Sequence, residues 1–157
     1  MHATTTQGAV QDGVRSFRAE VRLLEREMAR RLGSETSCCG VSLAQCHCLL
    51  EVDTRGELTV GDLAAALDVD GSTMSRNLDG MEAASLLERA PNPKDRRSVV
   101  VRLSGAGRRV VHDINRRNDR FYGELLGRMT AHEKRCVTEG VELLARKMRE
   151  LRGKEGA

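Results

Sequence analysis

Thiols are the side chains of this sequence with the most distinctive chemistry. Four of the five cysteines, Cys38, Cys39, Cys46 and Cys48, lie close together and are called the cysteine cluster below. Thiolates bind soft ions such as arsenite, Hg(II), Zn(II) and Cu(I), so the cluster predicts a site that senses a metal or metalloid. Residues 46 and 48 point about 200° apart on a helix, and a three-thiolate site would therefore combine Cys38 and Cys39 with Cys46. His47 ranks below the thiols as a ligand.

Two other interpretations of the cysteine cluster stay open. A redox switch needs only two thiols, at least one of them with a lowered pKa. The sequence places Cys38 and Cys39 in a link just before a helix N-terminus, where the thiolate is favoured. Alternatively, Cys46, Cys48 and Cys136 are small buried residues without a sensing role, which is common for reduced cysteines.

A second set of side chains has the chemistry that reads DNA. It consists of Ser72, Thr73, Ser75, Arg76 and Asn77 at the start of a predicted helix. A recognition helix presents short polar and basic residues in its first turns, because its N-terminal end enters the major groove. The same residues would suit an ordinary capped surface helix, so the segment that follows has to decide.

That segment is a predicted β-hairpin with a charged tip. Its strands are expected over Leu86–Ala90 and Ser98–Leu103, and the tip between them carries Lys94, Asp95, Arg96 and Arg97. Basic residues outnumber acidic ones here, although the whole chain has a net charge of only +3. Such a tip cannot contribute to a core, and it is either solvated or directed at a polyanion. A winged helix that binds only proteins is expected to lack it, so the tip favours DNA.

Two short helices joined by a tight turn must position these residues. The first is predicted over residues 59–67, with Thr59 as its N-terminal cap. Asp68–Gly71 forms the turn, and the next helix begins at about Ser72. Together with the hairpin, this is the order of a winged helix-turn-helix that spans Leu58 to Leu103.

Apolar residues recur every three or four positions in both terminal regions. The N-terminal seam comprises Val14, Phe17, Val21, Leu24 and Met28, and its helix is expected to end at Gly33 and Ser34. The C-terminal seam comprises Val137, Val141, Leu144, Met148 and Leu151, behind a helix cap at Thr130. Neither helix can form a core alone. Both are expected to pack together across a twofold axis, with packing inside one chain as the alternative.

These elements predict a mainly α fold with a small β-hairpin wing. Residues 1–36 would form an N-terminal tail and dimerisation helix, 37–105 the winged helix-turn-helix, and 106–157 the C-terminal dimerisation helices, within one compact domain. The sequence has an odd number of cysteines, no apparent signal peptide and no run of roughly 18 apolar residues. We therefore expect a cytoplasmic protein without membrane contact or structural disulfides.

Four short motifs lie in the same region and in a fixed order: Leu58–Ala64, Ser72–Leu78, Asp95–Ser98 and Leu103–Gly107. With these motifs the sequence resembles the MarR family of bacterial regulators, over about residues 15–150. The resemblance implies a homodimer whose terminal helices interlock and which binds a pseudo-palindromic operator in double-stranded DNA. It also implies that Asp95 braces the wing and that Arg97 enters the minor groove, where the negative potential suits an arginine.

The resemblance implies a transcriptional regulator, with repression as the expected sign, that needs no cofactor. A small inducer or a metal ion would release it from its operator. The cysteine cluster is not part of the family pattern, so a soft-metal signal, a redox signal and an organic ligand remain alternatives. The P-loop, nucleophile-elbow and H-E-x-x-H motifs are absent from the sequence, which argues against an enzyme. A thiol enzyme is the other class to consider.

Overall fold

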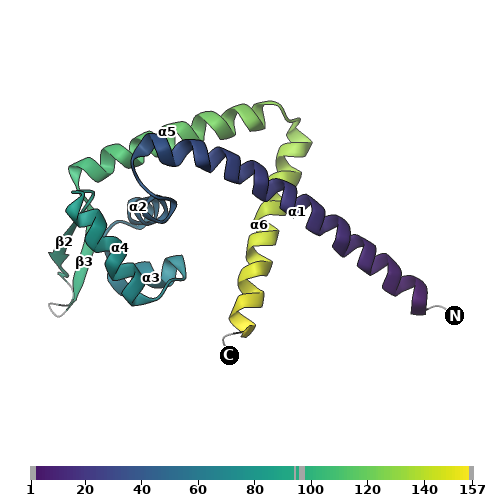
Figure 1. The fold of residues 1–157 in the computed structure, drawn as a ribbon, viewed down its shortest axis with the longest axis horizontal. Helices are drawn as coiled ribbons and strands as arrows, with labels where there is room; N and C mark the ends of the chain where they lie inside the picture. Colours follow the sequence, from purple (N-terminus) through teal and green to yellow (C-terminus); the bar gives the residue numbers. More distant parts are fainter. Residues whose placement is uncertain (1–2, 94, 96–97, 156–157) are drawn as a thin grey trace. The chain divides into compact units, whose positions relative to one another are not determined.

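The computed structural model describes the backbone of residues 3–93, 95 and 98–155, and the side chains of 11–31, 40–93, 95 and 98–153. Its elements in chain order are α1 (Ala3–Cys39), α2 (Leu43–Arg55), β1 (Leu58–Thr59), α3 (Val60–Leu67), α4 (Gly71–Ala83), β2 (Leu87–Pro91), β3 (Val99–Leu103), α5 (Gly105–Gly127) and α6 (Ala131–Glu155) (Figure 1). The chain forms two compact units, Met1–His112 and Asp113–Ala157. The mainly α fold with a small β component is confirmed.

Side-chain caps define the helix-turn-helix. Thr59 caps α3: its hydroxyl accepts a hydrogen bond from the Asp62 backbone N–H at 3.1 Å, and the Asp62 carboxylate accepts from the Thr59 N–H at 3.3 Å. This reciprocal arrangement satisfies two backbone donors that a helix start leaves without partners. Asp68 then adopts a left-handed conformation (φ 55°) and ends α3. Asp70 caps α4, which begins one residue earlier than predicted.

The wing is part of a three-stranded antiparallel sheet with the order β1–β3–β2. Leu87 pairs with Leu103 and Pro91 with Val99, which gives the predicted hairpin. The short strand β1 was not predicted: Leu58 pairs with Val101 on the other edge of β3. Two residues are too few to show a strand periodicity, so only the folded hairpin makes this pairing possible.

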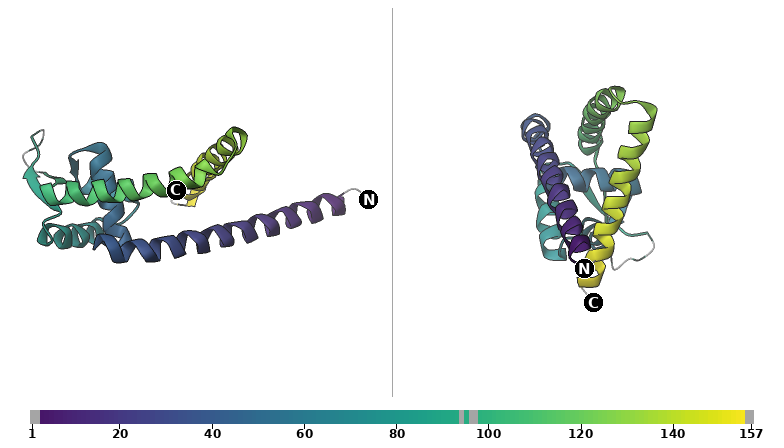
Figure 2. Two further views of the ribbon diagram at one scale, coloured as in Figure 1. Left: turned by 90° about the horizontal axis from the view of Figure 1, so that it is seen from above. Right: turned by 90° about the vertical axis from the view of Figure 1, so that its right-hand side faces the viewer.

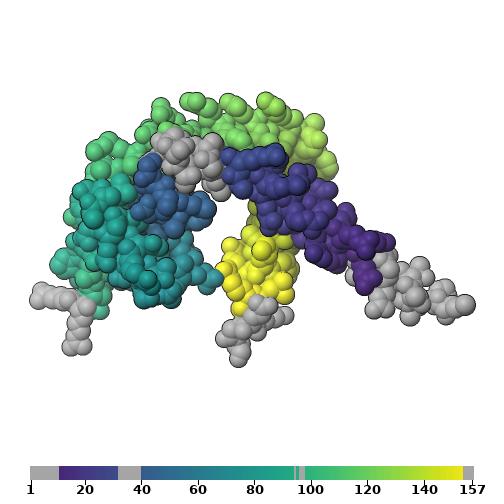
Figure 3. All heavy atoms as spheres, viewed as in Figure 1, coloured from purple at the N-terminus to yellow at the C-terminus, as the bar shows by residue number. Residues whose placement is uncertain are grey.

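The core of the first unit lies between α2, α3, α4 and the sheet, and Figure 3 shows these elements packed into one mass. Its largest fully buried side chains are Leu49, Leu63, Met74, Leu78, Met81, Val101 and Cys48. Burying a large aliphatic side chain contributes roughly 1.5–3 kcal/mol. The core therefore fixes the face of α4 opposite its polar residues, as the sequence pattern predicted.

The start of α5 lies directly against the end of α4. The Ser104 hydroxyl donates to the Ser85 carbonyl at 2.5 Å and accepts from the Gly107 N–H at 2.9 Å, so it caps α5 as well. The Ser104 N–H donates to the Leu86 carbonyl at 3.1 Å. A Cβ atom on Gly107 would lie only 2.0 Å from that carbonyl oxygen. This position therefore requires glycine.

The predicted end of the first helix at Gly33 and Ser34 is wrong. Helix α1 begins at Ala3, where a polar tail was expected, and runs without interruption to Cys39 (Figure 2). A glycine inside a helix costs only about 1 kcal/mol and does not by itself end it. The left-handed backbone that ends α1 occurs instead at Gly40 (φ 69°).

The terminal helices leave apolar side chains exposed in the single chain. In the N-terminal seam, Val14, Phe17 and Leu24 are all more than half exposed. In the C-terminal seam, Val141, Met148 and Leu151 are about 60% exposed. Within the described ranges, none of the helices combines the length and apolarity needed to span a bilayer.

Candidate nucleic-acid interface

Asp70 organises the first turn of α4, which holds the predicted DNA-reading residues. Its carboxylate accepts hydrogen bonds from the Thr73 N–H at 2.8 Å, the Ser72 hydroxyl at 2.5 Å and the Thr73 hydroxyl at 2.6 Å. The hydrogen bonds from these two hydroxyls and the Thr73 N–H hold the pKa of Asp70 well below its usual range. The carboxylate is therefore ionised, and it fixes both hydroxyls at the N-terminal tip of the helix.

The predicted DNA-reading residues differ in how far they reach solvent. Ser72 and Arg76 are exposed, whereas Thr73, Ser75 and Asn77 are half-buried. The Arg76 guanidinium turns back along the helix, and its Nε donates to the Ser72 carbonyl at 3.3 Å. An arginine held this way can exchange an intrahelical contact for a contact with a base edge or phosphate.

Sequence reasoning missed Arg89 as a residue of the candidate interface. From β2 its guanidinium reaches α4, with Nη2 2.5 Å from Asp79 Oδ1 and Nε 3.5 Å from Glu82 Oε2. These contacts tie the wing strand β2 to α4. The sequence shows a basic residue in a predicted strand that follows a helix with acidic residues. This pattern does not identify Asp79 and Glu82 as the partners of Arg89.

The base of the wing tip is closed by hydrogen bonds among described residues. The Asn92 N–H donates to the Ser98 carbonyl at 3.1 Å, and the Asn92 amide donates to the Ser98 hydroxyl at 2.8 Å. The Asp95 carbonyl accepts from the Ser98 N–H at 3.0 Å. The predicted contact residues Lys94, Arg96 and Arg97 lie outside the described residues.

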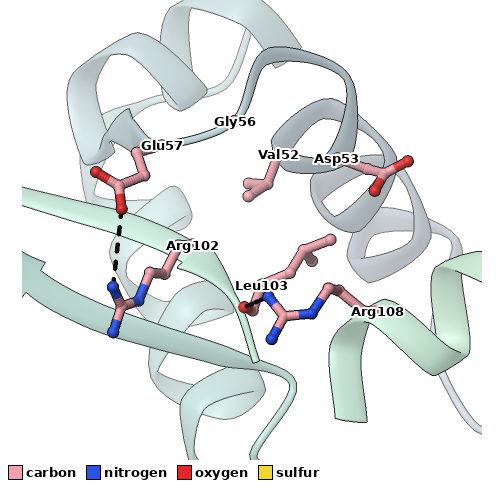
Figure 4. A pocket seen from close by; sticks show the side chains of 7 residues that line it. All are labelled: Val52, Asp53, Gly56, Glu57, Arg102, Leu103 and Arg108. Atoms are coloured by element: carbon pink, nitrogen blue, oxygen red, sulfur yellow. Dashed lines mark hydrogen bonds and ion pairs between the residues drawn. The ribbon is translucent and has the colours of Figure 1, made fainter. Parts of the chain in front are cut away.

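A shallow pocket of about 280 Å³ lies on the first unit, between the end of α2, β3 and the start of α5. Figure 4 shows Arg102 directed toward Glu57, 3.8 Å away, while Arg108 donates to the Leu103 carbonyl at 2.9 Å. Arg102 also binds Glu88 of β2 at 3.1 Å. These arginines hold the sheet and the start of α5 together, so we assign the residues that line the pocket a role in stabilising the fold.

Two members of the cysteine cluster, Cys46 and Cys48, lie among the described side chains. Cys48 packs in the core, with Sγ 3.9 Å from Met74 Sδ, and burial raises the pKa of this thiol. Cys46 is half-buried on α2. Among the described residues, no group of three or more His, Cys, Asp and Glu side chains could hold a metal ion.

The placement of Cys38 and Cys39 in a link before a helix N-terminus is wrong. Both residues belong to the last turn of α1, and α2 begins at Leu43 with Ser42 as its cap. The helix N-terminus, which favours a thiolate, is therefore not where the backbone of these residues lies. Their side chains lie outside the described residues.

Comparison with known proteins adds to this geometry. A family model described as MarR family matches residues 40–98, which run from α2 through the wing tip. The multiple antibiotic resistance protein MarR of Salmonella typhimurium is 27% identical over 114 residues, covering 72% of this chain and 79% of the relative. This chain is similar to the MarR family over these residues. Members of that family are transcriptional regulators.

Other proteins are similar to this chain over comparable lengths. The transcriptional regulator YdgJ of Bacillus subtilis is 27% identical over 110 residues, or 70% of this chain, and the match spans 65% of YdgJ, slightly less than two thirds. The solved structure of Streptococcus pneumoniae FabT in complex with DNA has a TM-score of 0.78 at 19% identity, covering 86% of this chain and 99% of FabT. At that identity the likeness concerns the fold.

Proposed function

We propose that this chain is a homodimeric repressor of the MarR type that binds a pseudo-palindromic operator in double-stranded DNA. The observation that carries the proposal is α4: a polar first turn fixed by Asp70, with the opposite face buried and the wing tied alongside through Arg89. FabT, which has a similar fold, was solved in complex with DNA. A chain with this role acts in the cytoplasm, where bacterial DNA lies, and requires no cofactor.

In this proposal the first turn of α4 enters the major groove. Ser72, Thr73, Ser75, Arg76 and Asn77 then contact base edges and the nearest phosphates. The wing enters the flanking minor groove with Arg97, helped by Lys94 and Arg96, while Asp95 braces the loop. On binding, the Arg76 guanidinium gives up its two weak hydrogen bonds to Ser72, at 3.3 and 3.4 Å, and forms stronger charge-assisted hydrogen bonds with DNA.

The exposed seams support the proposed homodimer. Val141, Met148 and Leu151 each leave about 60% of their surface in solvent, and pairing with a second copy would remove it. Burying this exposed surface contributes about 1 kcal/mol or more per residue. Residues 1–36 and 106–157 would thus serve dimerisation, and 37–105 DNA binding. A twofold dimer presents two copies of α4 to two half-sites of one operator.

We further propose that a signal at the cysteine cluster releases the operator. The candidates are Cys38 and Cys39 with Cys46, responding to a soft ion such as arsenite, Hg(II), Zn(II) or Cu(I), or to a thiol oxidant. Cys48 would serve packing, because its thiol is buried in the core. An organic inducer is the alternative. Titration of the operator complex with arsenite and Hg(II) tests this: if Cys38→Ser/Cys39→Ser responds like wild type, the signal acts elsewhere.

Arg97→Ala tests the DNA-binding mode. With an operator selected from a random DNA pool, we expect binding to weaken by about 1–3 kcal/mol, since one groove arginine is lost. Fold and dimer should remain intact. The matched control is Arg30→Ala, which removes one positive charge from an exposed ion pair with Glu27 on α1. Wild-type affinity and salt dependence in Arg97→Ala would exclude the wing from the interface.

A further inference from the structure

His132 and Cys136 lie one turn apart on α6 and face each other. The Cys136 Sγ atom is 3.5 Å from His132 Nε2 and 4.0 Å from Nδ1. Both side chains are exposed. The two side chains therefore present a nitrogen and a sulfur donor to solvent from one helix face.

The separation of these two donor atoms matches a metal chelate. Zinc is bound at about 2.3 Å by cysteine sulfur and about 2.0–2.1 Å by histidine nitrogen, in a tetrahedral arrangement. Two such ligands at the tetrahedral angle place sulfur and nitrogen about 3.5 Å apart. The distance between Sγ and Nε2 has this value without any movement of α6. In the absence of metal, the same distance allows the thiol to donate a hydrogen bond to the imidazole.

The pair lies beside the C-terminal seam rather than within it. At about 100° per residue, His132 lies about 100° or more around the helix from every residue of the seam, and Cys136 lies about 60° or more from them. A partner that covers the seam would therefore leave His132 in solvent, with Cys136 at the edge of the covered face.

We propose that His132 and Cys136 form a two-donor binding site for a divalent cation of the Zn(II) class. A thiolate with an imidazole selects borderline and soft ions over Mg²⁺ and Ca²⁺, which prefer oxygen ligands. Water completes the coordination, because no further side chain among the described residues joins the pair. On binding, the cation takes the place of the thiol proton, which passes to solvent, so each ion bound releases one proton at neutral pH.

The test uses the full-length reduced protein in a background that removes the other candidate thiol ligands: Cys38→Ser, Cys39→Ser and Cys46→Ser. Cd²⁺ is titrated in, and its thiolate charge-transfer absorption is recorded; Zn²⁺ then competes for the same site. We expect one Cd²⁺ per chain. Cys136→Ser should abolish the absorption. His132→Gln should weaken Cd²⁺ binding by more than about tenfold, because the loss of even an outer-shell partner lowers metal affinity by about 10–100-fold.

The control is His47→Gln, which removes an exposed histidine beside a cysteine on α2 and should leave Cd²⁺ binding unchanged. Far-ultraviolet circular dichroism checks that each variant keeps its helices, as expected for two exposed positions. Absorption that persists in Cys136→Ser would overturn the proposal. Equal affinity in His132→Gln and the background protein would do so too, because the thiol would then bind alone. Operator binding by the metal-free background protein is a separate readout of the proposed function.

Discussion

Replacing Gly107 by alanine tests the contact between the start of α5 and the end of α4. The new Cβ atom would lie 2.0 Å from the Leu86 carbonyl oxygen, 3.1 Å from its carbonyl carbon and 3.4 Å from Leu103 Cδ2. Ordinary contact begins near 3.4 Å, so the two backbones must separate by about 1.4 Å. A flexible side chain could move aside, but a carbonyl group held in the chain cannot.

The cost follows from three contributions. Overpacking costs about 1–3 kcal/mol, and a backbone neighbour places this site at the upper end. Separation also stretches the 3.1 Å hydrogen bond from Ser104 to Leu86, whose loss costs about 1 kcal/mol. Alanine returns about 1 kcal/mol through its better helix propensity. The free energy of unfolding should therefore fall by about 2–3 kcal/mol, which corresponds to roughly 5–10 °C in Tm.

The assay is urea unfolding followed by circular dichroism, at one fixed protein concentration because dimerisation shifts the apparent stability. The matched control is Gly80→Ala, also in a helix of the first unit, where a Cβ atom meets nothing within 4 Å. That variant should be more stable than wild type by about 0.5–1 kcal/mol. If Gly107→Ala is as stable as wild type, the close approach of α5 to Leu86 does not exist in solution.

Three further predictions concern the candidate interface and its support. Arg89→Gln should lower stability by no more than about 1 kcal/mol, because its ion pairs are partly exposed, yet it should weaken operator binding measured by fluorescence anisotropy; unchanged binding would contradict its positioning role. Because the pKa of Asp70 is lowered in the folded state, its ionised carboxylate stabilises the fold fully above about pH 4. This stabilisation is lost as the pH falls further, so the Tm difference between wild type and Asp70→Asn should narrow from pH 5 to pH 2.5. Cys48→Ser should cost about 1–3 kcal/mol by burying a hydroxyl, whereas Cys46→Ser should change stability by less than about 0.5 kcal/mol; equal effects in urea unfolding would contradict the core placement.

Periodicity and caps made the helix-turn-helix predictable. Thr59 and Thr130 are caps because their hydroxyls and nearby carboxylates satisfy local backbone donors, and such contacts depend only on neighbouring residues. The pairing of β1 with β3 and the reach of Arg89 to α4 were not predictable, since both depend on the folded arrangement of distant segments. The predicted helix end at Gly33 was wrong for a related reason. A glycine ends a helix only where the backbone adopts a left-handed conformation, and in this chain that occurs at Gly40.

The interface itself stays a prediction, and the structure shows the helix that carries it. The sequence placed the candidate residues at the start of α4, because polar side chains there stand out against the buried Leu78 and Met81. It did not show that Asp70 already engages the hydroxyls of Ser72 and Thr73, because both hydrogen bonds depend on the rotamers of the folded cap. The structure leaves the roles of Lys94, Arg96 and Arg97 as predictions.

The link through Arg89 has a consequence for protein engineering. Because Arg89 binds Asp79 and Glu82 in the C-terminal half of α4, the link to the wing does not use Ser72 or Arg76, whose hydrogen bonds lie within α4 and its cap. Their side chains can therefore be exchanged while the scaffold stays as it is. A library that varies Ser72 and Arg76 and keeps Asp70 and Arg89 should yield folded regulators with new operator preferences.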